Sequence, residues 1–356
     1  MLQLRTTRRD LRFNFPARTS RGALNEHTAH YLHLTDSQQP QRVGVGEAAP
    51  LAGLSPDHRP DFEATLNGFV REFNRRQLEE LHPTEALDLI GPEWPALRFA
   101  LETALLDWQQ GGRRQLFDTP FSRGEAGIPI NGLVWMGDAA FMRQQIEKKL
   151  TDGYSCLKLK IGGLDFATEL AILAEIRAIA GPEVLTLRVD ANGAFAPAEA
   201  LPKLEQLARF HLHSIEQPIK AGQWAALAEV CRQSPVPVAL DEELIGLTAP
   251  EQQRELLECT KPAYIILKPT LLGGLQASQH WMQLAETAGI GWWLTSALES
   301  NVGLNAISQL AAATATPDFP QGLGTGQLYH NNVASPLRID HGLLFYDASG
   351  SWEPTE

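Results

Sequence analysis

Apolar and polar residues alternate through most of the first 50 positions, which is the pattern of strands that are buried on one face. This alternation predicts three strands joined by turn residues, over 2–15, 28–35 and 42–48. Two segments with helical spacing follow, over 61–81 and 92–110, and Gly111-Gly112 ends the second. An antiparallel sheet followed by helices predicts an α+β domain in the first third of the chain.

Beyond about residue 126 the pattern changes to short apolar runs, each followed by an amphipathic segment. Seven or eight such runs can be counted, and the last is the weakest: 130–135, 156–161, 185–189, 213–215, 236–240, 264–267, 290–295 and 321–326. Helical patterns lie between them, for example over 165–180, 197–209, 223–233 and 275–289. This alternation predicts βα units built around a parallel sheet.

Polar side chains stand at the C-terminal end of most of these runs, at intervals of about 25 to 30 residues, which is the length of one βα unit. They are Lys158 with Lys160, Asp190, Glu216, Asp241, Lys268, and Ser296 with Glu299. In an open sheet such strand ends lie along a line, whereas in a closed barrel they converge on one axis, where barrel active sites are built. The sequence therefore favours a barrel domain over 126–334, a capping domain over 1–125, and a C-terminal tail of about 335–356 that packs back on the cap.

Three carboxylates, Asp190, Glu216 and Asp241, end three consecutive predicted strands. Carboxylates that converge in a buried barrel mouth repel one another unless a divalent cation holds them together. Oxygen ligands without His or Cys favour Mg²⁺, with Mn²⁺ as the second choice, over zinc or copper. The alternative is that each acidic residue caps a helix or solvates a loop. Three acids in register favour the metal site.

Lys158 and Lys160 are separated by one residue on an apolar strand, so both side chains point to the same face. If strand order follows chain order around a ring of eight, Lys268 lies opposite them. Two lysines flanking a substrate carbon, with a cation beside them, suit the removal of a proton next to a carboxylate. A like charge and a nearby cation lower a lysine pKa toward the range of a working base. The alternative is an edge strand that shows two lysines to water.

The composition limits which binding partners and which cellular compartment are expected. Thirty Lys and Arg residues against 42 Asp and Glu give a formal net charge of −12, so nucleic acid is not an expected partner. No apolar run approaches the roughly 18 residues that cross a bilayer, and the charged N-terminus does not resemble a secretory signal. Cys156, Cys231 and Cys259 form no CxxC pair, and we expect them to be small core residues. We therefore expect a cytoplasmic protein without a membrane partner.

Several segments together resemble the enolase superfamily, in the subgroup with a Lys-x-Lys pair on the second barrel strand. The matching barrel segments are Lys158-Leu-Lys160, Arg188-Val-Asp190-Ala-Asn192-Gly, Ile215-Glu216-Gln217-Pro218, Leu240-Asp241-Glu242 and Leu267-Lys268-Pro269. Segments 44–50 and 98–107 resemble the superfamily's cap. The resemblance implies an α/β fold, a modified TIM barrel of the (β/α)7β type with an α+β N-terminal capping domain. It also implies that Asp190, Glu216 and Asp241 bind Mg²⁺.

Within the superfamily, segments 296–306 and 322–328 look most like those of o-succinylbenzoate synthases. These are lyases of menaquinone or phylloquinone synthesis that dehydrate 2-succinyl-6-hydroxy-2,4-cyclohexadiene-1-carboxylate, a small dicarboxylate. The resemblance implies that Lys160 removes the proton next to the ring carboxylate and then protonates the departing hydroxyl. It implies that Lys268, on the opposite face, stabilises the enediolate.

Substrate contacts are expected from a set of polar residues: Lys158, Asn192, Ser296, Glu299, Ser300, Arg18, Ser20 and Arg21. The last three belong to a segment near 15–24 that looks like the mobile specificity loop of the superfamily, where Arg18 or Arg21 meets the carboxylate of the succinyl tail. The alternatives are a solvated basic turn for that loop and helix-capping roles for Ser296 and Ser300.

Three other activities use the same scaffold. Epimerases of dipeptides or N-acylated amino acids employ the same lysine pair, but dipeptide epimerases usually carry Asp-x-Asp near the last barrel strand, where this chain reads Gly322-Leu-Gly324-Thr-Gly326. That difference argues against a dipeptide substrate and leaves N-succinylamino-acid racemisation open. A muconate-type cycloisomerase is a weaker candidate. A non-catalytic binding barrel would not need both lysines and all three acids.

Overall fold

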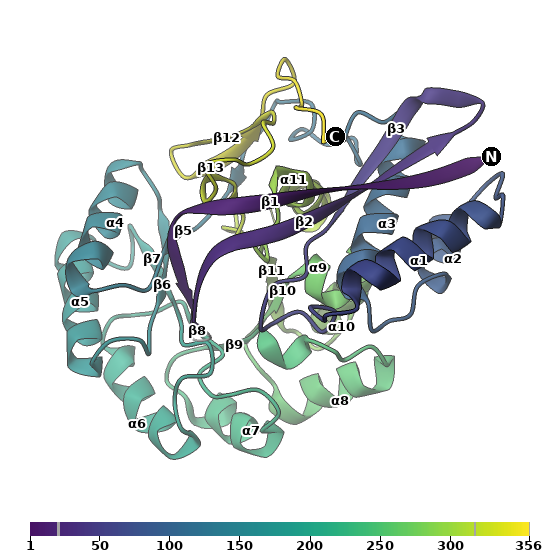
Figure 1. The fold of residues 1–356 in the computed structure, drawn as a ribbon. Coiled ribbons are helices and arrows are strands. Elements are labelled where there is room, and N and C mark those ends of the chain that lie inside the picture. Colours follow the sequence, from purple (N-terminus) through teal and green to yellow (C-terminus); the bar gives the residue numbers. More distant parts are fainter. Residues whose placement is uncertain (20–21, 317, 356) are drawn as a thin grey trace.

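The computed structural model describes residues 1–19, 22–316 and 318–355. Its N-terminal part is an antiparallel sheet, in the order β1 (Leu2–Thr19), β2 (Gly22–Asp36) and β3 (Gln39–Ala48), covered by helices. These helices are α1 (Phe62–Arg75), α2 (Pro83–Asp88) and α3 (Pro95–Gln109). The strands β1 and β2 extend from this cap over the barrel (Figure 1). A register shift in β1 between Arg12 and Ala17 interrupts their pairing midway.

Close packing of α3 on β3 explains two glycines of the cap. A Cβ atom added to Gly44 would lie 2.0 Å from the Ala104 carbonyl oxygen, and one added to Gly46 would lie 1.8 Å from that of Ala100. Both positions therefore accept only glycine. The first cap helix is shorter than predicted, because it ends at Arg75 and Gln77 adopts a left-handed φ of 50° that a helix cannot continue.

Seven parallel strands form the barrel, and their spatial order is their order in the sequence. They are β5 (Gly132–Val134), β6 (Cys156–Lys160), β7 (Thr186–Asp190), β8 (Ser214–Glu216), β9 (Val238–Leu240), β10 (Tyr264–Leu267) and β11 (Gly291–Leu294). The segment predicted as the weakest strand closes the ring by two parallel bridges, Gln321 with Ile130 and Gly322 with Thr295. The predicted modified barrel with its α+β cap is confirmed.

Helices surround this barrel on the outside (Figure 1). They are α4 (Ala139–Thr151), α5 (Phe166–Ile179), α6 (Pro197–Ala208), α7 (Trp224–Gln233), α8 (Pro250–Thr260), α9 (Pro269–Leu272), α10 (Leu275–Thr287) and α11 (Asn301–Thr314), with short 3-10 turns η1 (Glu242–Leu244) and η2 (Thr325–Gln327). One apolar core fills the space between the strands and this shell, and a second lies inside the cap. No helix among the described residues is long and apolar enough to cross a membrane.

The C-terminal tail contacts both the cap and the base of the barrel. Its strands β12 (Leu337–Asp340) and β13 (Leu343–Tyr346) form a small sheet with β4 (Ile128–Pro129). Farther along, Glu353 pairs with Arg9 of β1 (2.6 Å), and the Arg114 guanidinium lies over the Trp352 ring. These contacts fasten the end of the chain to the strand with which it begins.

One expectation about the cysteines is wrong. Cys156 is buried inside the barrel wall as expected, but Cys231 is only half-buried and Cys259 is exposed on α8. All three are free thiols. Helical amphipathicity explains the difference, since Cys259 falls on the solvent side of α8 while Leu256 and Leu257 occupy its buried side.

The cap contains a buried acid whose ionisation opposes folding. Asp57 Oδ2 accepts the N–H of Ala96 at the start of α3 (2.7 Å), and burial raises the pKa of Asp57 to about 7 although this hydrogen bond opposes the rise. The folded protein then keeps a proton that the unfolded chain releases near pH 4, so stability falls as the pH rises from about 4 to about 7.

We expect the free energy of unfolding of the wild type to fall by about 3 kcal/mol relative to that of Asp57→Asn across this range. Urea unfolding of both proteins at a series of pH values measures the difference. A difference that does not change with pH would contradict the assignment.

Candidate active site

Strand register places the predicted lysine and acids in one row. Lys160 of β6 pairs with Asp190 of β7, and Asp190 pairs in turn with Glu216 of β8. Because side chains alternate along a strand, all three point to the barrel interior, and so does Lys158 two residues before Lys160. β6 pairs with strands on both sides, which excludes the alternative of an edge strand that shows its lysines to water.

A network of ion pairs joins these side chains. Lys160 Nζ lies 2.6 Å from Asp190 Oδ2 and donates to Asn192 Oδ1 (2.8 Å). Lys158 Nζ bridges two acids, at 3.0 Å from Asp190 Oδ2 and 2.5 Å from Glu216 Oε2. The barrel thus holds two ammonium groups against two carboxylates, an arrangement in which each charge offsets the cost of burying the others.

Lys268 follows β10 on the other side of this cluster. Its Nζ donates to Asp241 Oδ2, and Asp241 itself follows β9. Lys160 and Lys268 both line one small pocket of about 80 Å³. The side chains of Lys160 and Lys268 are only 12% and 10% exposed, so what remains accessible of them faces this pocket. The structure therefore brings the two predicted catalytic amines together around a single space.

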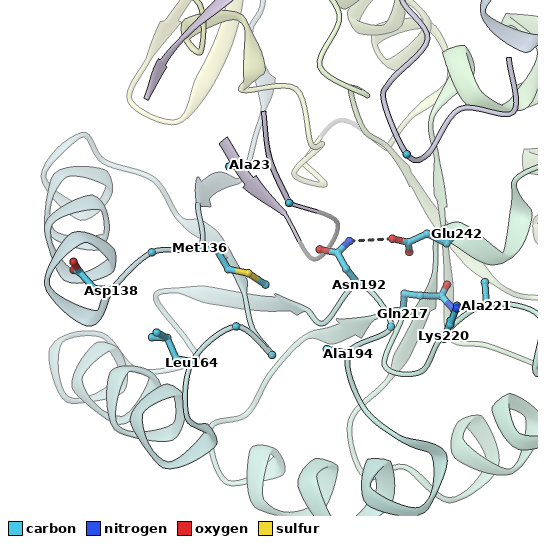
Figure 2. Close-up of a pocket in the computed structure, with 16 residues that line it drawn as sticks. Ala23, Met136, Asp138, Leu164, Asn192, Ala194, Gln217, Lys220, Ala221 and Glu242 are labelled. Atoms are coloured by element: carbon cyan, nitrogen blue, oxygen red, sulfur yellow. Dashed lines mark hydrogen bonds between the residues drawn. The ribbon is translucent and has the colours of Figure 1, made fainter. Parts of the chain in front are cut away.

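A wider cleft of about 1090 Å³ lies beside the small pocket and shares Asn192 with it. Figure 2 shows Asn192 beside Glu242, to which its amide donates (3.1 Å), and Gln217 next to Lys220 and Ala221. Loops at the carboxyl ends of β5 to β9 form this cleft, and Gly22 and Ala23 of the cap hairpin contribute to it. The cleft thus adjoins the pocket of the two lysines at Asn192.

Burial and neighbouring charges shift several pKa values in the cluster. Burial, followed by the charge of Asp190, raises the pKa of Glu216 to about 8. Burial acts in the same direction on Asp190, but the charges of Lys158 and Lys160 outweigh it and hold its pKa well below the usual range. Burial lowers the pKa of Lys268, and the Asp241 and Glu216 charges more than reverse this, so its pKa is raised. Glu216 is therefore the acid of this cluster that takes up a proton more readily than Asp190 does.

Asp190, Glu216 and Asp241 fit the expected divalent cation in their chemistry but are not yet arranged around one point. Within residues 1–19, 22–316 and 318–355, no three His, Cys, Asp or Glu side chains already converge as a metal cage. The ion pairs give the reason, because Lys158 and Lys268 lie against the acids. The donor set still fits a hard divalent ion, since all three side chains offer oxygen and the buried Oε1 of Glu216 has no hydrogen-bond partner.

The predicted substrate contacts occupy different places. Lys158, Asn192 and Ser296 line the small pocket. Glu299 is fully buried and accepts hydrogen bonds from Ser296 Oγ (2.5 Å) and from Thr270 Oγ1. Ser300 caps α11, where its hydroxyl accepts the N–H of Val302. Glu299 and Ser300 therefore stand behind the pocket wall, in hydrogen bonds with the protein.

The predicted specificity loop is described only in part. Ser20 and Arg21 lie outside the described residues, and for Arg18 only the backbone, paired with Ala23, is described. Near its start, the Phe15 ring packs edge-on against that of Trp135 (6.0 Å between centroids). The hairpin therefore reaches the barrel beside the pocket, as a specificity loop requires.

Sequence reasoning missed several residues of the pocket wall. Leu51 and Leu54 of the cap, together with Trp135 at the end of the first barrel strand, supply apolar surface opposite the charged cluster. Trp135 stands at the same strand-end position as the residues that were predicted, so its place in the sequence was an available signal. Leu51 and Leu54 carry no such signal, because a cap loop reaches the barrel only through tertiary packing.

Comparison with known proteins places the chain in a family. The "Enolase C-terminal domain-like" family model matches residues 141–350. An o-succinylbenzoate synthase of Desulfotalea psychrophila is 48% identical, over 96% of this chain and 98% of that protein. The crystal structure of MenC from the same organism superposes with a TM-score of 0.85 at 44% identity, and covers 97% of this chain and 99% of that chain.

More distant relatives share the fold. An L-Ala-D/L-Glu epimerase of Bacillus subtilis is 27% identical over 76% of this chain and 74% of that protein. A structure of the Bacillus subtilis enzyme, in complex with substrate, has a TM-score of 0.82 at 21% identity and covers 99% of this chain and 96% of that chain. The chain belongs to the enolase superfamily and, within it, to the o-succinylbenzoate synthase family.

Proposed function

We propose that this chain is a lyase that dehydrates 2-succinyl-6-hydroxy-2,4-cyclohexadiene-1-carboxylate to 2-succinylbenzoate. The near full-length relative at 48% identity is the observation that carries the proposal. Two opposed lysines at one pocket, with acids beside them, supply the groups that this reaction needs. The racemase and epimerase alternatives are not favoured, because the relatives with those names match at lower identity or over less of the chain.

The reaction assigns two steps to Lys160. As a neutral amine, its Nζ takes the proton from the ring carbon that bears the carboxylate, and the electron pair moves into that carboxylate as an enediolate. The resulting ammonium then gives this proton to the hydroxyl on the same face, and the C–O bond breaks with release of water. Asn192 and Asp190 orient the amine through their contacts with Nζ. Aromatisation of the ring makes the elimination strongly favourable.

Lys268 faces the same pocket from the end of β10, the next strand after the acids, and it stays protonated because its pKa is raised. A fixed ammonium in a buried site stabilises negative charge as it develops on the enediolate. Lys268 therefore acts on the charge of the intermediate, whereas Lys160 moves the proton.

Divalent-metal dependence is typical of the enolase superfamily, and we assign the metal ligands to Asp190, Glu216 and Asp241, with Mg²⁺ as the ion and Mn²⁺ as a substitute. The bound ion supplies neutralisation of the enediolate charge. The unpartnered Oε1 of Glu216 supports this assignment. Ligation of the acids would also release Lys158 and Lys268 from their present ion pairs toward the substrate.

The physiological setting follows from the product. 2-Succinylbenzoate formation belongs to menaquinone or phylloquinone biosynthesis, so we propose that the chain acts there, in the cytoplasm, on a small dicarboxylate. Contacts to the succinyl tail are assigned to Ser296 in the pocket and to the arginines of the loop near 15–24.

One assay separates the candidate activities. We expect the purified protein with Mg²⁺ to convert the cyclohexadiene substrate with a kcat/KM at least about 100-fold above that for racemisation of an N-succinylamino acid, since every 1.4 kcal/mol of differential transition-state binding is worth tenfold. Absorbance of the aromatic product and polarimetry measure the two rates. A preference for the amino acid would make the chain a racemase and overturn the proposal.

A further inference from the structure

One fully buried acid of the cap reaches into the barrel. Glu47 is the second-to-last residue of β3, and it is fully buried. Its Oε1 accepts the Ser300 N–H (2.7 Å), and its Oε2 accepts the Ser300 hydroxyl (2.5 Å) and the Gly303 N–H (2.7 Å). These three donors belong to the first turn of α11, where N–H groups have no partner within the helix. A side chain of the N-terminal domain thus satisfies the N-terminus of a barrel helix.

The loop that α11 follows forms a wall of the reactive pocket. Residues Thr295 to Leu298, between β11 and α11, all line the pocket that contains Lys160 and Lys268. Leu298 has a φ of 70°, which costs a non-glycine residue about 1 kcal/mol or more and persists only where neighbours hold it. The Leu298 carbonyl accepts the Tyr329 hydroxyl (2.6 Å) on one side of this residue, and Glu47 anchors Ser300 on the other.

Glu47 is also close in the chain to the pocket wall that the cap supplies. The chain runs from Glu47 through Ala48 and Ala49 into the turn that carries Leu51 and Leu54, which line the pocket from the cap side. The cap wall and the barrel wall are thus joined at Glu47. The two catalytic lysines are held elsewhere, since Lys160 at the end of β6 pairs with Asp190 and Lys268 just after β10 pairs with Asp241.

We propose that Glu47 is a positioning residue, which holds the cap loop and the β11–α11 loop in the arrangement that receives the substrate. It acts through Ser300 and Gly303 and does not touch the reacting atoms. The inference rests on the proposed function, because it concerns the binding of that substrate. It differs from the assignment of Ser300 as a direct substrate contact, since here the Ser300 hydroxyl is engaged by Glu47.

The variant Glu47→Gln tests the proposal. Glutamine keeps the shape of the side chain but turns one oxygen into an N–H group that faces a donor, so at least one of the three hydrogen bonds is lost. At pH 8, we expect KM for the cyclohexadiene substrate to rise about tenfold, equivalent to 1.4 kcal/mol, while kcat stays within about twofold. An unchanged KM, or a fall in kcat at unchanged KM, would overturn the proposal.

Asp57→Asn is the matched control, because Asp57 is an equally buried cap carboxylate that accepts a helix N-terminal N–H but lines no wall of the pocket. We expect its KM to stay within about twofold of the wild type. An equal rise in KM for both variants would mean that general loosening of the cap is responsible, and would also overturn the proposal.

A double-mutant cycle and a substrate-free measurement complete the test. If Glu47 acts through Ser300, the effects of Glu47→Gln and Ser300→Ala on KM are not additive; additive effects would contradict this coupling. Amide hydrogen exchange of a peptide covering 296–305 should be at least about tenfold faster in Glu47→Gln than in the wild type, with no change in Asp57→Asn. Amide exchange needs no substrate, so it tests the role of Glu47 even if the wild type fails to dehydrate the cyclohexadiene. That failure by itself would refute the proposed function.

Discussion

Replacing Lys160 with alanine is expected to lower kcat for dehydration at least about 10³-fold, while the protein stays folded. In the proposed mechanism the amine of Lys160 takes and returns the proton, and its neighbour Asp190 is a poor replacement as a base, because the charges of Lys158 and Lys160 hold the Asp190 pKa well below its usual range. Lys268→Ala should lower kcat by at least about 10²-fold through loss of charge stabilisation in the intermediate. Product absorbance gives both rates.

Deuterium exchange separates the two lysines. In D₂O, Lys160→Ala should no longer exchange the ring proton next to the carboxylate of a bound substrate analogue that lacks the leaving hydroxyl. The exposed Lys148, which pairs with Asp152 on α4, provides a matched control, and Lys148→Ala should keep wild-type rates. Near-normal turnover of Lys160→Ala would remove the base assignment.

Removal of divalent cations should abolish activity, and Mg²⁺ or Mn²⁺ should restore it. Without a cation, the acids compete for the lysines, and burial together with the Asp190 charge keeps the pKa of Glu216 at about 8. A bound dication stabilises the ionised acids and the enediolate together, so we expect a loss of more than about 10³-fold after EDTA treatment and desalting. The assay is repeated after addition of each metal.

A second readout does not depend on catalysis. Because an ion that binds only the folded state stabilises it, Mg²⁺ at 100 times its Kd should raise the free energy of unfolding by about 2.7 kcal/mol, and Glu216→Gln should remove most of this gain. Asp138→Asn is the control, since Asp138 lines the neighbouring cleft but caps α4 through the Phe141 N–H. Full activity in the chelated protein would refute the metal site.

Burial of so many charges raises the question of how the barrel tolerates them. Lys158, Lys160 and Lys268 each lie against at least one carboxylate, whereas the buried guanidinium of Arg188 stacks on the Trp293 ring (4.1 Å) and donates to the Pro320 carbonyl. Removing one partner of such a pair leaves an uncompensated charge, which is costly. Substitutions in this cluster therefore need a check of folding before their kinetics are interpreted.

Local periodicity was sufficient to predict the strands that carry the chemistry. The alternation in β6 placed Lys158 and Lys160 on one face, and the regular spacing of strand ends brought Asp190, Glu216 and Asp241 to one end of the barrel. Both patterns are properties of a strand or of one βα unit, so a short window of sequence contains them.

The sequence by itself determined the order of the strands, the identity of the chemical groups and the family of the chain. Only the tertiary structure decided how the ring closes at Gln321 and Gly322, and that Ser300 turns to Glu47 instead of the pocket. Only it decided that Leu51 and Leu54 complete the pocket. These contacts join residues that are far apart in the chain, and they depend on how whole elements pack within the barrel and between barrel and cap, which no local pattern of residues encodes.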